Sequence, residues 1–118
     1  MIRENGTYRL DERFEMRGGS GTVRIEHLFE PNTELNSPAR LCAKLTLDAG
    51  VSIGFHTHGE EEEIFHIIRG SARVDDNGEV KVLSAGDSIL TGNGAGHALA
   101  NAGNEPLEVL AVIVPFTK

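Results

Sequence analysis

The sequence predicts an all-β fold made of one domain, a barrel or a sandwich. About eight to ten short segments with the period of β-strands follow one another at regular spacing, and no segment has a convincing helical period. Asn77-Gly78, between two of these segments, is the signature of a tight hairpin turn. A length of 118 residues is enough for one buried core and too short for a second.

The predicted strands follow an N-terminal arm, residues 1–21. The arm ends in the glycine-rich segment 17–21, which we interpret as a flexible connector. The rest of the arm is too weakly periodic to assign, and we expect it to pack on the barrel or on a second subunit. Residues 22–118 then form the barrel. Its predicted strands are 22–29, 39–47, a short strand around His56 and His58, 63–68, 71–75, 79–83, 87–91, 97–102 and 107–115.

Two of the predicted strands are apolar on both faces. In the segment 63–68, Phe65 lies on one face while Ile64 and Ile68 lie on the other, and the segment 107–114 is almost entirely apolar. A barrel strand needs only one apolar face for the interior, so the second face must be covered by something else. We therefore expect a homodimer.

Composition limits the classes of partner and the compartment. The formal net charge of −7 and a pI near 5.1 argue against nucleic acid, because phosphate binding needs a basic face. No apolar run approaches the roughly 20 residues of a membrane helix, and the N-terminus has no apolar signal-peptide core. The single cysteine, Cys42, agrees with a reducing compartment. We expect a cytoplasmic protein that binds neither nucleic acid nor membrane.

The chemistry of the chain is concentrated around two histidines one residue apart. In an extended segment His56 and His58 project to the same side and can reach one ion together. A carboxylate follows at Glu63, and His97 lies in a second glycine-punctuated segment that can fold back toward them. Three His and one Glu suit one divalent transition metal per chain: Mn, Fe, Ni, Cu or Zn.

Other polar residues of the chain have less specific sequence patterns. Glu60–Glu63 would ordinarily be a solvated acidic turn, and only Glu63 is anchored at a strand end. His27 on an apolar face is typical of a structural histidine, and we expect Arg40 and Lys44 to face bulk water rather than a pocket mouth. Candidate acids or bases near the metal are His27, His66 and Lys44, and Cys42 is expected to be a small, partly buried strand residue.

The two segments resemble the paired motifs of the cupin superfamily. Gly50, His56, His58, Glu63 and Gly70 match the spacing of the first family motif, and Gly86, Gly94, His97 and Asn101 match the second. The proline of the second motif is replaced by Gly92, which we expect to loosen one turn without affecting a ligand. The resemblance implies a single-domain jelly-roll β-barrel with a metal held by His56, His58, Glu63 and His97.

For function the resemblance implies a class rather than a reaction. Four ligands of His and Glu type on an octahedral ion leave about two positions for a substrate, which favours a metal-dependent enzyme of the dioxygenase, isomerase or lyase type. Its substrate would be a small oxygen-bearing molecule in an interior lined by Phe65, Ile67 and Leu99. The alternative is a non-catalytic module that binds a small molecule or a sugar.

Overall fold

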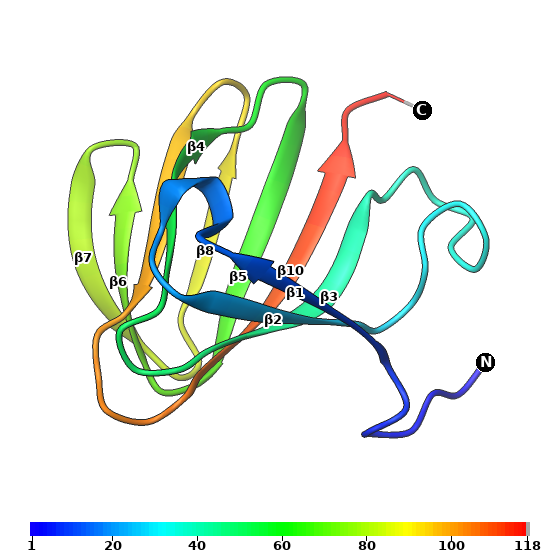
Figure 1. Ribbon diagram of the computed structural model, residues 1–118. Coiled ribbons are helices and arrows are strands. Elements are labelled where there is room, and N and C mark those ends of the chain that lie inside the picture. Colours follow the sequence, from blue (N-terminus) through cyan, green and yellow to red (C-terminus); the bar gives the residue numbers. More distant parts are fainter. Residues whose placement is uncertain (118) are drawn as a thin grey trace.

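The computed structural model describes residues 1–117 and confirms the all-β prediction (Figure 1). Within this range the chain forms ten strands and a single short 3₁₀ helix. No helix of the described chain is long and apolar enough to cross a membrane. The elements, in chain order, are β1 (Arg9–Phe14), η1 (Met16–Gly18), β2 (Thr22–His27), β3 (Leu41–Leu47), β4 (Ser52–Thr57), β5 (Glu61–Arg69), β6 (Ser71–Asp76), β7 (Glu79–Ser84), β8 (Ser88–Gly92), β9 (Gly96–Asn101) and β10 (Leu107–Pro115).

The strands form two facing sheets, as a jelly-roll barrel requires. Across residues 1–117 one sheet has six strands in the order β1-β2-β3-β10-β5-β8 and the other has four in the order β4-β9-β6-β7. All the strand pairs are antiparallel. The chain crosses repeatedly between the sheets, so β4, β5 and β9, which carry the predicted ligands, come together at one end of the barrel.

The core lies between the two sheets and follows the alternation of the strands. Along β5, Glu63, Phe65 and Ile67 are buried, whereas Ile64 and Ile68 face outward and are 39% and 46% exposed. In β10 every second residue from Leu107 to Ile113 is buried, and the residues between them are half-buried. The hairpin prediction is confirmed, because β6 and β7 pair through a turn in which Asn77 and Gly78 have positive φ.

The N-terminal arm contains a strand that its sequence does not reveal. Residues Arg9–Phe14 form β1, which pairs with β2 at the edge of the six-stranded sheet. Most of β1 is exposed on both faces, so it lacks the apolar alternation by which strands are recognised. Backbone pairing and polar contacts therefore hold this segment on the barrel.

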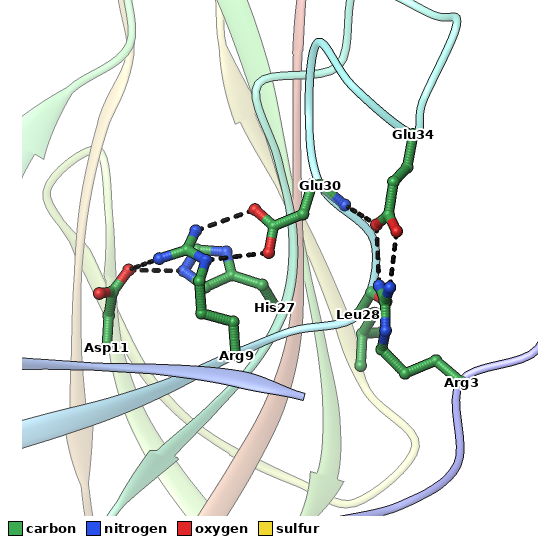
Figure 2. A network of polar contacts seen from close by, with 7 residues as sticks. All are labelled: Arg3, Arg9, Asp11, His27, Leu28, Glu30 and Glu34. Atoms are coloured by element: carbon green, nitrogen blue, oxygen red, sulfur yellow. Dashed lines mark hydrogen bonds and ion pairs between the residues drawn. The ribbon is translucent and has the colours of Figure 1, made fainter. Parts of the chain in front are cut away.

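Figure 2 shows the polar contacts that fix the arm. Arg3 makes a bidentate ion pair with Glu34 at 2.8 and 2.6 Å, and Arg9 makes another with Glu30 at 2.9 and 3.0 Å. These pairs join the arm to the loop after β2. The guanidinium of Arg3, by its hydrogen bonds, lowers the pKa of Glu34 to about 2, so the pair stays ionised far below neutral pH.

Residues 15–21, which include the expected flexible connector, instead form a closed turn that lies beside β4 (Figure 1). The amide of Glu15 donates to the carbonyl of Gly21 at 2.8 Å, and the amide of Ser52 donates to the carbonyl of Ser20 at 2.9 Å. The backbone of this turn also packs directly on Gly54, where a Cβ atom would overlap the carbonyl oxygen of Arg17. We refer to residues 15–21 as the docked turn.

Replacing Gly54 with alanine tests this close packing. The added Cβ must displace the docked turn, so we expect Gly54→Ala to lower the free energy of unfolding by about 1–3 kcal/mol. Urea denaturation of metal-free protein measures the change. Gly103→Ala is the matched control, because its Cβ would lie 3.8 Å from Asn101 Oδ1, an ordinary contact. Equal stability of the two variants would contradict the packing of the turn on β4.

Candidate metal centre

The structure brings together the four residues that the sequence singled out. His56 comes from β4, His58 directly follows β4, Glu63 comes from β5 and His97 from β9. His56 and His97 face each other as cross-strand partners. One ligand atom from each of the four residues lies within 4.8 Å of the other three. His58, Glu63 and His97 are buried, and His56 borders the pocket described below.

The backbone of β4 and its neighbours fixes the position of His58. Its amide donates to the carbonyl of Ala95 at 3.0 Å, and its own carbonyl accepts from the amide of Gly94 at 2.7 Å. The loop before β9 is therefore tied to the end of β4. As a result, two segments that are far apart in the sequence present their imidazoles to one point.

Each imidazole is oriented by a hydrogen bond at its other ring nitrogen. His56 Nδ1 lies 2.8 Å from the carbonyl oxygen of Gly54, and His97 Nδ1 lies 3.0 Å from Thr91 Oγ1. His58 Nδ1 lies 2.6 Å from a carboxylate oxygen of Glu61. Because these oxygens accept, the protons are assigned to Nδ1, and the Nε2 lone pairs are left facing the cluster.

The atoms inside the cluster fit a shared cation. The Nε2 of His97 lies 3.1 Å from that of His58 and 3.2 Å from that of His56, and both His58 and His97 approach Glu63 Oε1 to 2.9–3.0 Å. Lone pairs and a carboxylate held this close repel one another unless a positive charge lies among them. His56, His58, Glu63 and His97 would therefore hold one divalent transition metal ion between them, and imidazole and carboxylate are donors that such ions accept.

The surroundings of His56 favour its neutral form. Burial, followed by repulsion from His97, His58 and Arg17, lowers the pKa of His56, although its hydrogen bond to Gly54 opposes this. Neutral imidazole is the form that binds a metal, so His56 is prepared for coordination at neutral pH.

Glu61 is a functional residue that sequence reasoning missed, because it was counted within the solvated acidic run. Its carboxylate accepts from His58 Nδ1 and is held by Arg40 through two hydrogen bonds of 2.8 Å. The hydrogen bond from Arg40 lowers the pKa of Glu61 to about 2, so the carboxylate stays ionised and keeps His58 oriented. Neither Glu61, one of four consecutive glutamates, nor Thr91, which orients His97, carries a signal of this role in the sequence.

A pocket of about 380 Å³ opens onto this cluster. It lies between the two sheets at the end of the barrel where the docked turn is attached. Its lining residues come from β1, the docked turn, β2, β3 and the residue before it, β4 and the residue after it, β5 and β10: Arg13, Phe14, Glu15, Met16, Arg17, Ile25, His27, Arg40, Leu41, Leu45, Ile53, His56, His58, Glu63, Phe65 and Ile113. The mixture of apolar walls and a few charged groups is typical of a small-molecule site.

The structure separates the acid and base candidates. His27 lines the pocket, and its Nε2 lies 2.7 Å from Asp11 Oδ2 (Figure 2). His66 instead faces outward and hydrogen-bonds Ser88, and Lys44 pairs with Glu26 and Glu108 on the outer face of the same sheet. His27 is therefore the only one of the three that borders the pocket in the described chain.

Two expectations about the pocket need correction. Arg40, which was expected to face bulk water, borders the pocket while it holds Glu61. Of the expected apolar lining, Phe65 lies in the pocket and stacks on His97 with ring centroids 4.6 Å apart. Ile67 and Leu99 belong to the main core and do not reach the pocket among the described residues.

Other sequence expectations concern single residues. Cys42 is half-buried on β3, where burial raises the pKa of its thiol and makes it less reactive. Gly92 packs against Glu61 and Glu62, where a Cβ atom would clash, and the looser turn expected from the missing proline stays a prediction. Asn101 has a structural role: its side-chain amide donates to the carbonyls of Leu47 and Glu105.

The fold and the site define a class of protein: a small jelly-roll barrel with a His₃Glu cluster at one open end. A family model described as a cupin domain matches residues 43–113, more than half of the chain. The chain therefore belongs to the cupin family.

The chain is also similar to individual proteins of known sequence or structure. A protein of Thermotoga maritima named oxalate-binding protein is 41% identical over 99 residues, covering 84% of this chain and 81% of its own. A crystal structure described as a predicted oxalate decarboxylase, also from T. maritima, has a TM-score of 0.92 at 36% identity, covering 98% of this chain and 99% of its own. An RmlC-like cupin from Shewanella frigidimarina, with a TM-score of 0.76 over 99% of this chain and 92% of its own, is 16% identical and supports the fold alone.

The role of Glu61 can be tested without disturbing any ligand atom. Glu61→Gln removes the negative charge that orients His58, so we expect affinity for Zn(II) or Mn(II) to fall about 10–100-fold. Competition with a chelating dye measures this affinity. Glu60→Gln, which changes a neighbouring exposed carboxylate, should leave it unchanged. Equal affinity of both variants and the wild type would show that Glu61 does not position His58.

Proposed function

We propose that this protein binds oxalate, or a similarly small dicarboxylate, at a divalent transition metal held by His56, His58, Glu63 and His97. The observation that carries the proposal is the joint presence of this cluster and 41% identity to a protein named for oxalate binding. Once bound, the metal would supply a positive centre that both carboxylates of the ligand can chelate. The number of metals expected is one per chain.

The pocket supports a ligand of this size and charge. A volume of about 380 Å³ accommodates a molecule of a few heavy atoms, and His56, His58 and Glu63 of the cluster are part of its lining. Phe65, Leu45 and Ile53 supply apolar walls that reduce competition from water around the ligand. Such walls strengthen the attraction between a dianion and the charges inside the pocket.

Metal and oxalate binding should depend on the same four residues. We expect metal-stripped wild-type protein to take up one equivalent of Mn(II), Fe(II), Ni(II), Cu(II) or Zn(II), and to bind oxalate only afterwards. His58→Ala and Glu63→Gln should lose most of the metal and all metal-dependent oxalate binding. Elemental analysis and isothermal titration calorimetry measure the two steps.

The matched control for these variants is His66→Ala. It removes a histidine from the outer face of β5, where it contacts Ser88 rather than the cluster. This variant should bind metal and oxalate like the wild type. Full metal content in His58→Ala and Glu63→Gln would reject the ligand assignment, and oxalate binding to metal-free protein would reject the metal dependence.

A second candidate function, decarboxylation of oxalate, is favoured by the description of the 36% identical crystal structure. In this reaction the carbon–carbon bond of the oxalate monoanion breaks, and formate and carbon dioxide form with the proton ending on the formate carbon. It is the lyase member of the expected enzyme classes. Glu15 and His27 are titratable pocket residues outside the cluster that could handle this proton. Carbon-13 NMR of labelled oxalate with metal-loaded protein would detect formate directly.

The expected homodimer is also a proposal, and it rests on the outer face of the six-stranded sheet. Ile64 lies in register between Leu90 of β8 and Val112 of β10, and Val112 is in turn opposite Cys42 of β3. Ile64 and Leu90 are 39% and 63% exposed. An uninterrupted apolar row across four strands suits a second copy of the same face.

Charge substitution in this row tests the dimer. We expect wild-type protein to sediment as a dimer at micromolar concentration, and Ile64→Glu with Leu90→Glu to sediment as a monomer because a carboxylate would be buried in the interface. Val80→Glu, at an equally exposed position on β7 of the other sheet, is the control and should stay dimeric. A monomeric wild type would overturn the proposal. The cytoplasmic location and the lack of nucleic-acid and membrane partners stay predictions.

A further inference from the structure

We infer that Arg17, carried by the docked turn, is the specificity residue that holds the metal-remote oxygens of a dicarboxylate ligand. This inference rests on the proposed function and names a residue outside the four ligands. A chelated dicarboxylate directs its coordinating oxygens at the metal and its other oxygens into the pocket. Those outer oxygens carry negative charge and require donors from the protein.

The pocket has three arginines, and their contacts distinguish them. Arg40 makes a bidentate ion pair with Glu61 through Nε and Nη2, so its charge is already paired and its orientation is set by Glu61. Arg13 and Arg17 also line the pocket, and neither makes an ion pair or a side-chain hydrogen bond with the described residues. A guanidinium has five donors and no acceptor, so these two side chains are available to an anion.

Arg17 is attached closer to the cluster than Arg13. The carbonyl oxygen of Arg17 packs on Gly54, whose own carbonyl oxygen lies 2.8 Å from His56 Nδ1. The two side chains share the pocket, but Arg13 lies on β1 opposite Val23, at the edge of the sheet. The geometry therefore favours Arg17 for the ligand end and leaves Arg13 to attract anions from solution.

The backbone holds Arg17 in place in an unusual conformation. Glu15 and Arg17 have φ values of 50° and 54°, in the left-handed region that non-glycine residues seldom adopt. The carbonyl of Arg17 packs on Gly54, and the carbonyl of Gly54 accepts from His56 Nδ1. The residue that carries the guanidinium is thus attached to the residue that orients a metal ligand.

The fixed backbone of the docked turn reduces the conformational entropy that Arg17 loses when a ligand binds. A guanidinium on a flexible arm would lose conformational entropy on each binding event, whereas the docked turn has already fixed its backbone. The turn is closed by the backbone hydrogen bond from the amide of Glu15 to the carbonyl of Gly21. It is attached to β4 by the hydrogen bond from the amide of Ser52 to the carbonyl of Ser20. Only the side chain of Arg17 then has to become ordered around the ligand.

The test compares two ligands and three variants in Mn(II)-loaded protein by isothermal titration calorimetry. We expect Arg17→Met to raise the Kd for oxalate about 10–100-fold, the effect of losing charge-assisted hydrogen bonds to a buried anion. Glycolate, which has one carboxylate, should show a clearly smaller rise. Arg17→Lys should recover part of the oxalate affinity, since it restores the charge without the planar fork.

Controls separate recognition from structural damage. Arg73→Met removes an exposed arginine on β6, remote from the pocket lining, and should leave the Kd unchanged. Affinity for Mn(II) should be unchanged or tighter in Arg17→Met, because a positive charge near His56 is removed. A loss of Mn(II) binding in that variant, or equal effects on oxalate and glycolate, would overturn the inference.

The outcome also distinguishes this inference from the function on which it rests. If wild-type protein loaded with metal does not bind oxalate, the proposed function is wrong and the role of Arg17 falls with it. If wild type binds oxalate and Arg17→Met binds it equally well, the proposed function stands and Arg17 is not its specificity residue.

Discussion

The convergence of three imidazole nitrogens and one carboxylate within a few ångströms is the constraint on which the rest of this structure depends. Such a cluster is unfavourable unless a cation is shared among the four groups, because lone pairs and negative charge are held together in a partly dry barrel. The strands around the cluster must hold the four groups in place both with and without the cation. Antiparallel pairing of β4 with β9 and of β5 with β8 provides that rigidity.

A second set of contacts, outside the ligands, determines which nitrogen of each histidine faces the cluster. A backbone carbonyl, a threonine hydroxyl and a carboxylate each accept from one Nδ1. The positions of the three acceptors depend on different parts of the chain. The carbonyl of Gly54 depends on the docked turn, whereas the carboxylate of Glu61 depends on Arg40. The orientation of the imidazoles in the cluster is thereby linked to parts of the chain outside the cluster.

The N-terminal segment gives this barrel its particular pocket. β1 extends the larger sheet, and the docked turn follows it and lies beside β4 (Figure 1). Glu15, Met16 and Arg17 of this turn line the pocket that opens onto the cluster. Ion pairs at Arg3 and Arg9 attach the beginning of the segment to the loop after β2 (Figure 2). The family model begins only at residue 43, so this wall of the pocket lies outside the part of the chain that defines the family.

The sequence by itself determined the fold class, the hairpin at Asn77-Gly78 and the four residues of the cluster. Strand alternation and the His-x-His spacing are local patterns, and local patterns are legible without coordinates. It could not show that Glu61, rather than Glu60 or Glu62, contacts His58, because neighbouring glutamates differ only in the direction of their side chains.

Only the tertiary structure decided the positions and contacts of β1, Arg17, Arg40 and Thr91. β1 has exposed residues on both faces, so it carries no apolar period, and it becomes a strand because β2 offers an unpaired edge. Arg40 and Lys44 look alike in the sequence, yet one reaches the pocket and the other pairs with carboxylates on the outer face. Contacts between residues distant in the chain depend on how the two sheets pack against each other, and no local pattern in the sequence encodes that packing.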